Sequence, residues 1–106
     1  MVKHVILWKL KDEITEGTKE EAIAKIKRDL EALNGQIEGL VSLKVIVPDL
    51  TSSNADIMLD STLESEEALK GYQVHPAHVA VSEYVKKVRV ARVVLDAQLD
   101  ENKNLI

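Results

Sequence analysis

Alternating apolar and polar positions predict β-strands in four parts of the chain. In the first of them, Ile6 and Trp8 point to one side of the strand while Val5 and Leu7 point to the other. We expect the first, second and fourth strands to be apolar on both sides at their centres, so that both faces of the sheet need cover. The predicted strands are residues 2–10, 40–47, 55–63 and 89–96.

Helix signals separate these strands. Thr18 to Glu21 reads as a capping box, in which the threonine hydroxyl and the glutamate carboxylate satisfy free backbone donors, and Asn34-Gly35 ends the helix that follows. Ser65 begins a short second helix, and Pro76 suits the first turn of another. Apolar residues at helical spacing form the inner side of the first helix: Ala22, Ile23, Ile26, Leu30 and Leu33.

With the second helical region counted as one unit, the order of elements is β-α-β-β-α-β. This order is the α+β, ferredoxin-like arrangement, in which a four-stranded antiparallel sheet carries its helices on one face. The other face then lacks cover. The economical cover is a second copy of the chain, because a two-fold contact buries the same patch twice. The pattern therefore predicts a homodimer with an interface above about 2,000 Å².

The length of 106 residues suits one domain, predicted as residues 1–98 with a polar C-terminal tail at 99–106. The chain has no cysteine, which removes disulfides, thiolate nucleophiles and iron–sulfur clusters from its possible chemistry and favours a cytoplasmic location. The apolar opening residues contain Lys3, His4 and Lys9 and lack a cleavage site, so they do not read as a signal peptide. No stretch approaches the roughly 20 apolar residues of a membrane span, so no membrane partner is expected.

The net charge of −4 argues against nucleic acid as a partner, because phosphate binding depends on clustered Lys and Arg. One short basic cluster is present between residues 86 and 92. The chain has no Phe, two Tyr and one Trp, so it offers no row of aromatic rings for base stacking. A small-molecule ligand is the better expectation.

The stretch from Gly71 to His78, with the sequence Gly-Tyr-Gln-Val-His-Pro-Ala-His, concentrates two of the three histidines and one of the two tyrosines. On this run the chain resembles the stress-responsive α/β-barrel family, often called Dabb, over nearly its whole length. Four further segments carry the same resemblance: Val2 to Val5, Lys9 to Asp12, Asp56 to Leu59 and Arg92 to Asp96.

The resemblance implies a dimeric α/β barrel with a cavity beneath the helices of each subunit and no cofactor. Many members have no assigned role, while some similar plant proteins close polyketide chains by aldol condensation. Carried over by motif, the base of that branch falls on His78 and the residue that orients or polarises the substrate falls on Tyr72. The branch has a further histidine on the third strand, where this chain has Ile57 in the cavity.

His78 and Tyr72 have both a chemical and a structural interpretation. An imidazole near its unperturbed pKa can accept a proton at neutral pH, and a phenol can polarise a carbonyl oxygen. The alternative is that both side chains satisfy buried backbone groups where two helices meet. His75 is expected to cap the helix that Pro76 begins.

Other candidates are weaker. His75 and His78 lie three residues apart, and Asp56 and Asp60 share one strand face, but no third ligand is fixed locally, so no metal site is predicted. His4 is expected to line the core or the cavity and is included among the ligand-binding residues with Tyr72, His78 and Ile57. Trp8 and Met58 read as core residues.

Three functional classes stay open at this point. The first is a small-molecule binding or stress-protection protein that binds an apolar or aromatic molecule near Tyr72 and His78. The second is a cofactor-independent enzyme, similar to a polyketide cyclase, with His78 as base and Tyr72 as polarising group. The third is a haem-dependent or oxygen-using relative of the same architecture.

Overall fold

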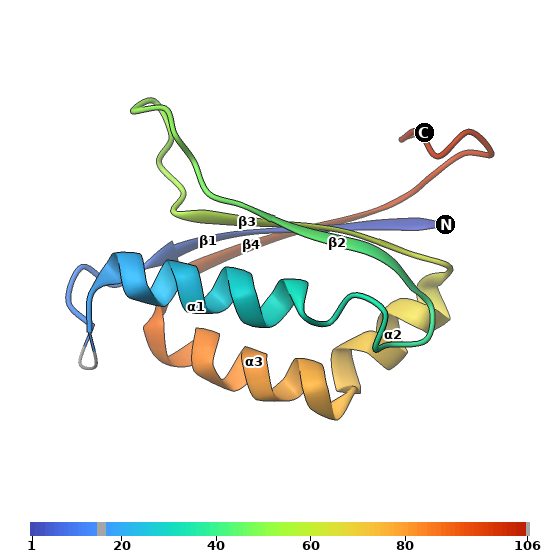
Figure 1. Ribbon diagram of the computed structural model, residues 1–106. Helices are drawn as coiled ribbons and strands as arrows, with labels where there is room; N and C mark the ends of the chain where they lie inside the picture. The colour runs from blue at the N-terminus through green and yellow to red at the C-terminus, as the bar shows by residue number, and fades with distance from the viewer. Residues whose placement is uncertain (15–16, 106) are drawn as a thin grey trace.

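Four strands form one antiparallel sheet in the order β2-β3-β1-β4, and all three helices lie on one side of it (Figure 1). The computed structural model describes residues 1–14 and 17–105. The elements are β1 (Val2–Leu10), α1 (Lys19–Glu31), β2 (Leu40–Ile46), β3 (Ile57–Leu63), α2 (Glu66–Val74), α3 (Pro76–Val88) and β4 (Arg89–Gln98). The predicted ferredoxin-like fold is confirmed, with two consecutive helices between β3 and β4.

Local signals begin the helices at the predicted residues. The Thr18 hydroxyl accepts a hydrogen bond from the Glu21 amide at 3.1 Å, and the Ser65 hydroxyl accepts one from the Ala68 amide at 3.0 Å. Both residues are the N-caps of their helices, α1 and α2. The hydrophobic core lies between the sheet and the helices, where Ile26, Leu59 and Leu63 have at most 1% of their surface exposed.

Helix α1 ends at Glu31, earlier than Asn34-Gly35, and the residues after it are tied to the edge strand β2. The Asn34 side chain donates to the Leu43 carbonyl and accepts from the Leu43 amide, both at 2.9 Å. The Glu31 carboxylate accepts from the Val45 amide at 3.0 Å, and the Lys27 ammonium donates to the Val45 carbonyl at 2.7 Å. Side chains of the α1 region therefore occupy backbone groups that an edge strand otherwise leaves free.

The sheet face away from the helices carries a row of apolar side chains that crosses all four strands. Cross-strand pairing places Ile46 opposite Met58, Met58 opposite Leu7, and Leu7 opposite Val93. Val5 and Leu95 form a second apolar pair beside this row. We call these six residues the bare face, and four of them, Leu7, Ile46, Val93 and Leu95, are 37–62% exposed.

The bare face is apolar chiefly on β1 and β4. On β2 this side of the sheet holds Ser42 and Lys44 beside Ile46, and Val41 lies at the irregularity in the β2–β3 register. The expectation that β2 is apolar on both sides is therefore wrong, because its only large apolar side chain on that face is Ile46. In Figure 1 the loop between β2 and β3 and the C-terminal segment both rise on this side of the sheet.

Strand β4 differs from the other strands because neither of its faces is buried. Its residues Val90 to Asp96 are all exposed, and Val94, which pairs with the buried Ile6, is 36% exposed. Helix α3 packs against α1 and α2 and leaves space beside this strand. Within the described part of the chain, no helix is long and apolar enough to cross a membrane.

Candidate functional site

Three of the predicted polar residues lie in a row. The rings of Tyr72, on α2, and His78, on α3, have their centroids 4.3 Å apart at an interplanar angle of 44°. On the other side of Tyr72, His4 of β1 lies 6.2 Å away in an edge-on arrangement at 69°. Three elements that are distant in sequence thus bring one phenol and two imidazoles together.

The corner between α2 and α3 sets the positions of Tyr72 and His78. His75 is the C-cap of α2 and the N-cap of α3: its amide donates to the Tyr72 carbonyl at 3.2 Å, and its Nδ1 accepts from the Ala77 amide at 3.1 Å. Pro76 is the first residue of α3, where its missing N–H leaves no bond unmade. The predicted capping role of His75 is confirmed.

His78 is held in a defined tautomer. Its Nδ1 lies 3.2 Å from the carbonyl oxygen of Gln73, and since a carbonyl can only accept, Nδ1 carries the hydrogen of the neutral ring. Nε2 is then the atom with the free lone pair. Burial lowers the pKa of His78 below its ordinary value, the bond to Gln73 opposes this, and the charges of His4 and Arg92 lower it further. The residue is therefore a neutral imidazole at neutral pH, able to accept a proton.

Tyr72 is fully buried between the two histidines. Its hydroxyl has no hydrogen-bond partner among the residues that the structure describes. Burial raises the pKa of this phenol, so it stays protonated and can only act as a neutral donor or acceptor. A buried hydroxyl without a protein partner is uncommon, and strain, a functional role or a bound water accounts for such groups.

His4 is bound to a carboxylate at the end of the row. Its Nδ1 lies 2.5 Å from an oxygen of Asp96, which is its direct neighbour on β4, and its backbone carbonyl accepts from the Ser61 hydroxyl at 2.9 Å. Only 1% of His4 is exposed, whereas the Asp96 side chain is 42% exposed. The Asp96 carboxylate fixes the hydrogen of His4 on Nδ1, since a carboxylate accepts.

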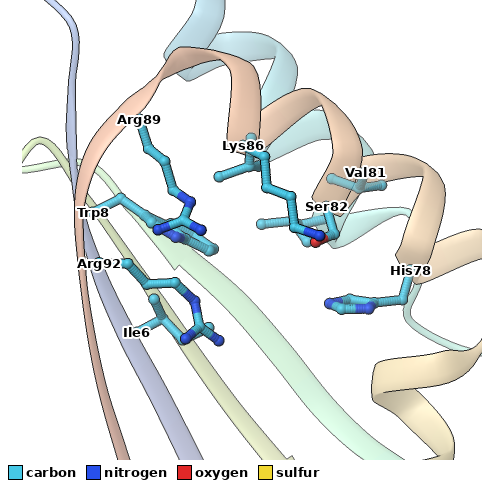
Figure 2. A pocket seen from close by; sticks show the side chains of 10 residues that line it. Ile6, Trp8, His78, Val81, Ser82, Lys86, Arg89 and Arg92 are labelled. Carbon is cyan, nitrogen blue, oxygen red and sulfur yellow. The ribbon is translucent and has the colours of Figure 1, made fainter.

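A cleft of about 220 Å³ opens between α3 and the strands β1 and β4. Figure 2 shows His78 on one side of it and Arg89 and Arg92 on the other. Its apolar residues come from β1, α1 and α3, and its polar side chains come mostly from the end of α3 and the start of β4. The lining residues are Ile6, Trp8, Leu30, His78, Val81, Ser82, Val85, Lys86, Arg89 and Arg92.

Of the four residues predicted to bind a ligand, only His78 lines this cleft. Tyr72 contacts the His78 ring, and His4 lies near Tyr72, but neither is among the residues that line the cleft. Ile57 is 1% exposed, pairs with Trp8, and borders a separate hollow beside the β2–β3 loop. The ligand-binding roles of His4, Tyr72 and Ile57 stay predictions.

Sequence reasoning missed the cationic side of the cleft. From the sequence, the basic cluster enters only the argument on nucleic-acid binding, and Trp8 is predicted only as a core residue. The members of that cluster that line the cleft are Lys86, Arg89 and Arg92. The structure pairs Arg92 directly with Trp8 across β1 and β4. Alternation along the fourth strand puts Arg92 on the same face as Val94 and Asp96. This pattern could have predicted a cationic side chain on the helix side of the sheet.

Asp56 and Asp60 have structural partners. Asp56 accepts from the Leu10 amide at 2.7 Å and lies 3.3 Å from the Lys19 ammonium, while Asp60 pairs with Lys3 at 2.9 Å. Among the described residues, 1–14 and 17–105, no three His, Asp or Glu side chains gather in a way that could hold a metal ion.

Comparison with known proteins gives consistent results. Olivetolic acid cyclase from Cannabis sativa is 34% identical over 91 aligned residues, which cover 74% of this chain and 76% of the cyclase. A dimeric protein of unknown function and ferredoxin-like fold from Bacteroides fragilis superposes with a TM-score of 0.85 at 26% identity, covering 92% of this chain and 95% of that one. A protein from Arabidopsis thaliana superposes with a TM-score of 0.77 at 25% identity, covering 95% and 97%.

The model of the Dabb family, described as the stress responsive A/B barrel domain, matches residues 2–99. This range includes all seven helices and strands and the His4, Tyr72 and His78 row. The resemblance inferred from the Gly71 to His78 run is confirmed, and the protein belongs to the stress responsive A/B barrel domain family.

Proposed function

We propose that this protein binds a small, mostly apolar molecule in the cleft beside His78. The observation that carries the proposal is the position of His78, whose ring lines a cleft floored by Ile6, Trp8 and Leu30. Ligand sites in proteins are typically concavities that combine apolar walls with convergent polar groups, and this cleft combines five apolar side chains with five polar or charged ones. At about 220 Å³ it is smaller than the sites of drug-sized ligands, so its ligand is small.

We also propose that the protein forms a homodimer in which a second copy covers the bare face. The row from Ile46 to Val93 is too apolar and too continuous to face water unaided. The similar protein from Bacteroides fragilis is described as dimeric, which supports this assembly. The cleft lies on the helix side of the sheet, so a partner on the bare face leaves it accessible.

Ligand mapping by NMR tests the binding proposal. A fragment set of small aromatic ketones, phenols and acids is screened against isotope-labelled protein, with His78→Gln as the matched variant. We expect hits to shift the methyl resonances of Ile6, Val81 and Val85 and the ring resonance of His78, and to bind His78→Gln more weakly. Hits that shift only bare-face residues such as Leu7 and Val93 would show that the ligand site lies elsewhere.

A second function, cofactor-independent proton transfer, is favoured by the tautomer of His78. With Nδ1 bound to the Gln73 carbonyl, Nε2 keeps its lone pair for a substrate proton. The Tyr72 ring lies against His78, and its hydroxyl, which has no partner among the described residues, would polarise a developing oxyanion if substrate binding brings the two together. The similar cyclase from Cannabis sativa supports an enzyme of this class, acting on a compound with an acidic proton beside a carbonyl.

Solvent exchange at a carbon acid tests this second function. The α-protons of a small aryl β-diketone are followed by NMR in D₂O with and without protein. His78→Gln should slow the catalysed exchange by about 10² to 10⁴, the usual contribution of a general base. Tyr72→Phe should lower the rate less while raising the free energy of unfolding, because it removes a buried hydroxyl without a partner. If His78→Gln exchanges the α-protons as fast as the wild type, the proton-transfer proposal is wrong and only the binding proposal stands.

A further inference from the structure

One side of the cleft offers hydrogen-bond donors only. The side chains of Trp8, Lys86, Arg89 and Arg92 have N–H groups and no acceptor atoms. No aspartate or glutamate is among the ten lining residues. This local excess of positive charge stands in a chain whose net charge is −4. The cleft is therefore electrostatically different from the molecule around it.

The cations of the cleft are poorly neutralised by the protein itself. Lys86 lies 3.7 Å from a Glu83 oxygen, and both side chains of that pair are more than half exposed, so water weakens it. Within residues 1–14 and 17–105, Arg89 and Arg92 form no ion pair. Like charges held together repel one another, and a bound anion would remove that repulsion.

The indole of Trp8 gives a second, independent indication. Only 5% of Trp8 is exposed, and its Nε1–H has no acceptor among the described residues. Figure 2 shows the Trp8 ring between the side chains of Arg89 and Arg92, which carry donors and no acceptors. An oxyanion placed there can accept from both guanidinium groups, and the buried indole N–H beside them adds a further donor without an acceptor among the described residues. Arginine is suited to this role because its planar fork matches carboxylate and phosphate oxygens.

We infer that the cleft selects a small ligand with one anionic group, a carboxylate or a phosphate, which Arg89 and Arg92 bind while the apolar body of the ligand rests on Ile6 and Leu30. This inference rests on the proposed function, since it specifies the ligand of the same cleft. His78 supplies the acceptor at the opposite side. It precedes Lys86 by eight residues on α3, a rise of about 12 Å along the helix, so the ligand is a short acid.

Three probes with the same 4-butylphenyl body test the inference: 4-butylbenzoate, its uncharged near-isostere 4-butylbenzamide, and 4-butylphenyl phosphate. Each is titrated by NMR into the wild type, into the double variant Arg89→Gln/Arg92→Gln, and into Arg28→Gln, which removes one positive charge outside the cleft. The His78 ring resonance, assigned from the spectrum of His78→Gln, reports binding in the cleft.

The wild type should bind the benzoate at least about tenfold more tightly than the amide at low salt, and added salt should reduce this preference. The double variant should lose the preference and Arg28→Gln should keep it. Tighter binding of the phosphate than of the benzoate also supports the inference and identifies the anion as a phosphate. If the double variant does not fold, the wild type alone tests the inference: added salt should reduce its preference for the benzoate over the amide, and a preference that salt leaves unchanged would contradict charge selection.

Two outcomes overturn the inference and can be told apart. If benzoate and amide bind equally and both shift the His78 resonance, the cleft is a ligand site without charge selection, and the proposed function stands. If none of the three probes shifts a cleft resonance at millimolar concentration, both the inference and the proposed binding site are wrong.

Discussion

The two edge strands of the sheet are opposite in character. Strand β2 buries Leu43 and Val45 beneath α1, and side chains of the α1 region bind its outer backbone groups. Strand β4 is exposed on both faces, and no such side-chain bonds reach its backbone from the rest of the described chain. An edge strand whose backbone groups are bonded by side chains of its own chain cannot pair with another molecule. An edge strand with exposed apolar side chains and no such bonds can contact a partner. Both proposed contacts of this protein, the partner copy and the ligand, lie along β4.

The largest expected effect is on the open edge. Val93→Glu places a carboxylate in the β4 part of the bare face, and the two-fold contact would bury it twice. Because burying an unpaired charge is unfavourable by several kcal/mol, the dissociation constant of the dimer should rise by at least about 100-fold. Analytical ultracentrifugation over a dilution series measures this.

Val74→Glu is the matched control for Val93→Glu, since Val74 is 74% exposed on α2, on the helix side of the sheet. It should leave the dissociation constant unchanged. A wild type that sediments as a folded monomer at micromolar concentration, or equal effects of the two variants, would contradict the proposed dimer.

A smaller effect is expected at the protected edge. Glu31→Ala removes the acceptor of the Val45 amide and the partner of Lys27. Hydrogen bonds to a charged group contribute more than neutral ones, so the free energy of unfolding should fall by about 1 to 2 kcal/mol. Urea unfolding measures this, with Glu38→Ala, an exposed loop residue, as control. Equal stability of both variants would mean that α1 does not protect β2 in this way.

The hydrogen bond from the Val45 amide is the largest influence on the pKa of Glu31 and lowers it. The hydrogen bond from Lys27 lowers it as well, and together they outweigh burial, which would raise it. The free energy that Glu31 contributes to folding is therefore fully present at pH values above the ordinary pKa of glutamate. It is lost as the pH falls through the lowered pKa of the folded state. The stability difference between wild type and Glu31→Ala should shrink in acid.

The smallest expected effect concerns the cleft beside β4. Burial, aided by the charges of His4, Arg92 and His75, lowers the pKa of His78 although Gln73 opposes it, so the folded protein binds fewer protons here than the unfolded chain does. Stability should fall as the pH drops from the ordinary histidine value through the lowered one. His78→Gln should therefore lose less stability than the wild type between about pH 7.5 and about pH 5.5, as measured by urea unfolding. Parallel pH profiles would mean that the ring is hydrated like a surface histidine.

The sequence predicted what depends on neighbouring residues. Thr18, Ser65 and Pro76 begin their helices because their side chains or ring act on the next turn of the same chain. The four strands were likewise found within two residues of their ends, because alternation is a local property. His78 was predicted beside Tyr72 through the family motif, and the stacking of the two rings agrees with that expectation.

Features that depend on register and packing were not predictable in the same way. Whether Arg92 faces Trp8 depends on how β4 pairs with β1, more than eighty residues apart. The protection of β2 by Glu31 and Asn34 depends on where α1 lies above the sheet. The exposure of the helix side of β4 depends on the position of α3, which packs against α1 and α2 and leaves the cleft beside this strand, and hydrophobic patterning could not distinguish this from a buried strand.

The corner at His75 makes the spacing between Tyr72 and His78 intolerant of insertions and deletions. Tyr72, Gln73, His75 and His78 are connected by backbone and side-chain bonds that span one helix end and one helix start. One added residue would turn His78 by about 100° around α3 and carry its ring away from the phenol. The length of the segment from Gly71 to His78 is therefore fixed by the contact between the two rings, whereas the other loops that the structure describes carry no such constraint on the site.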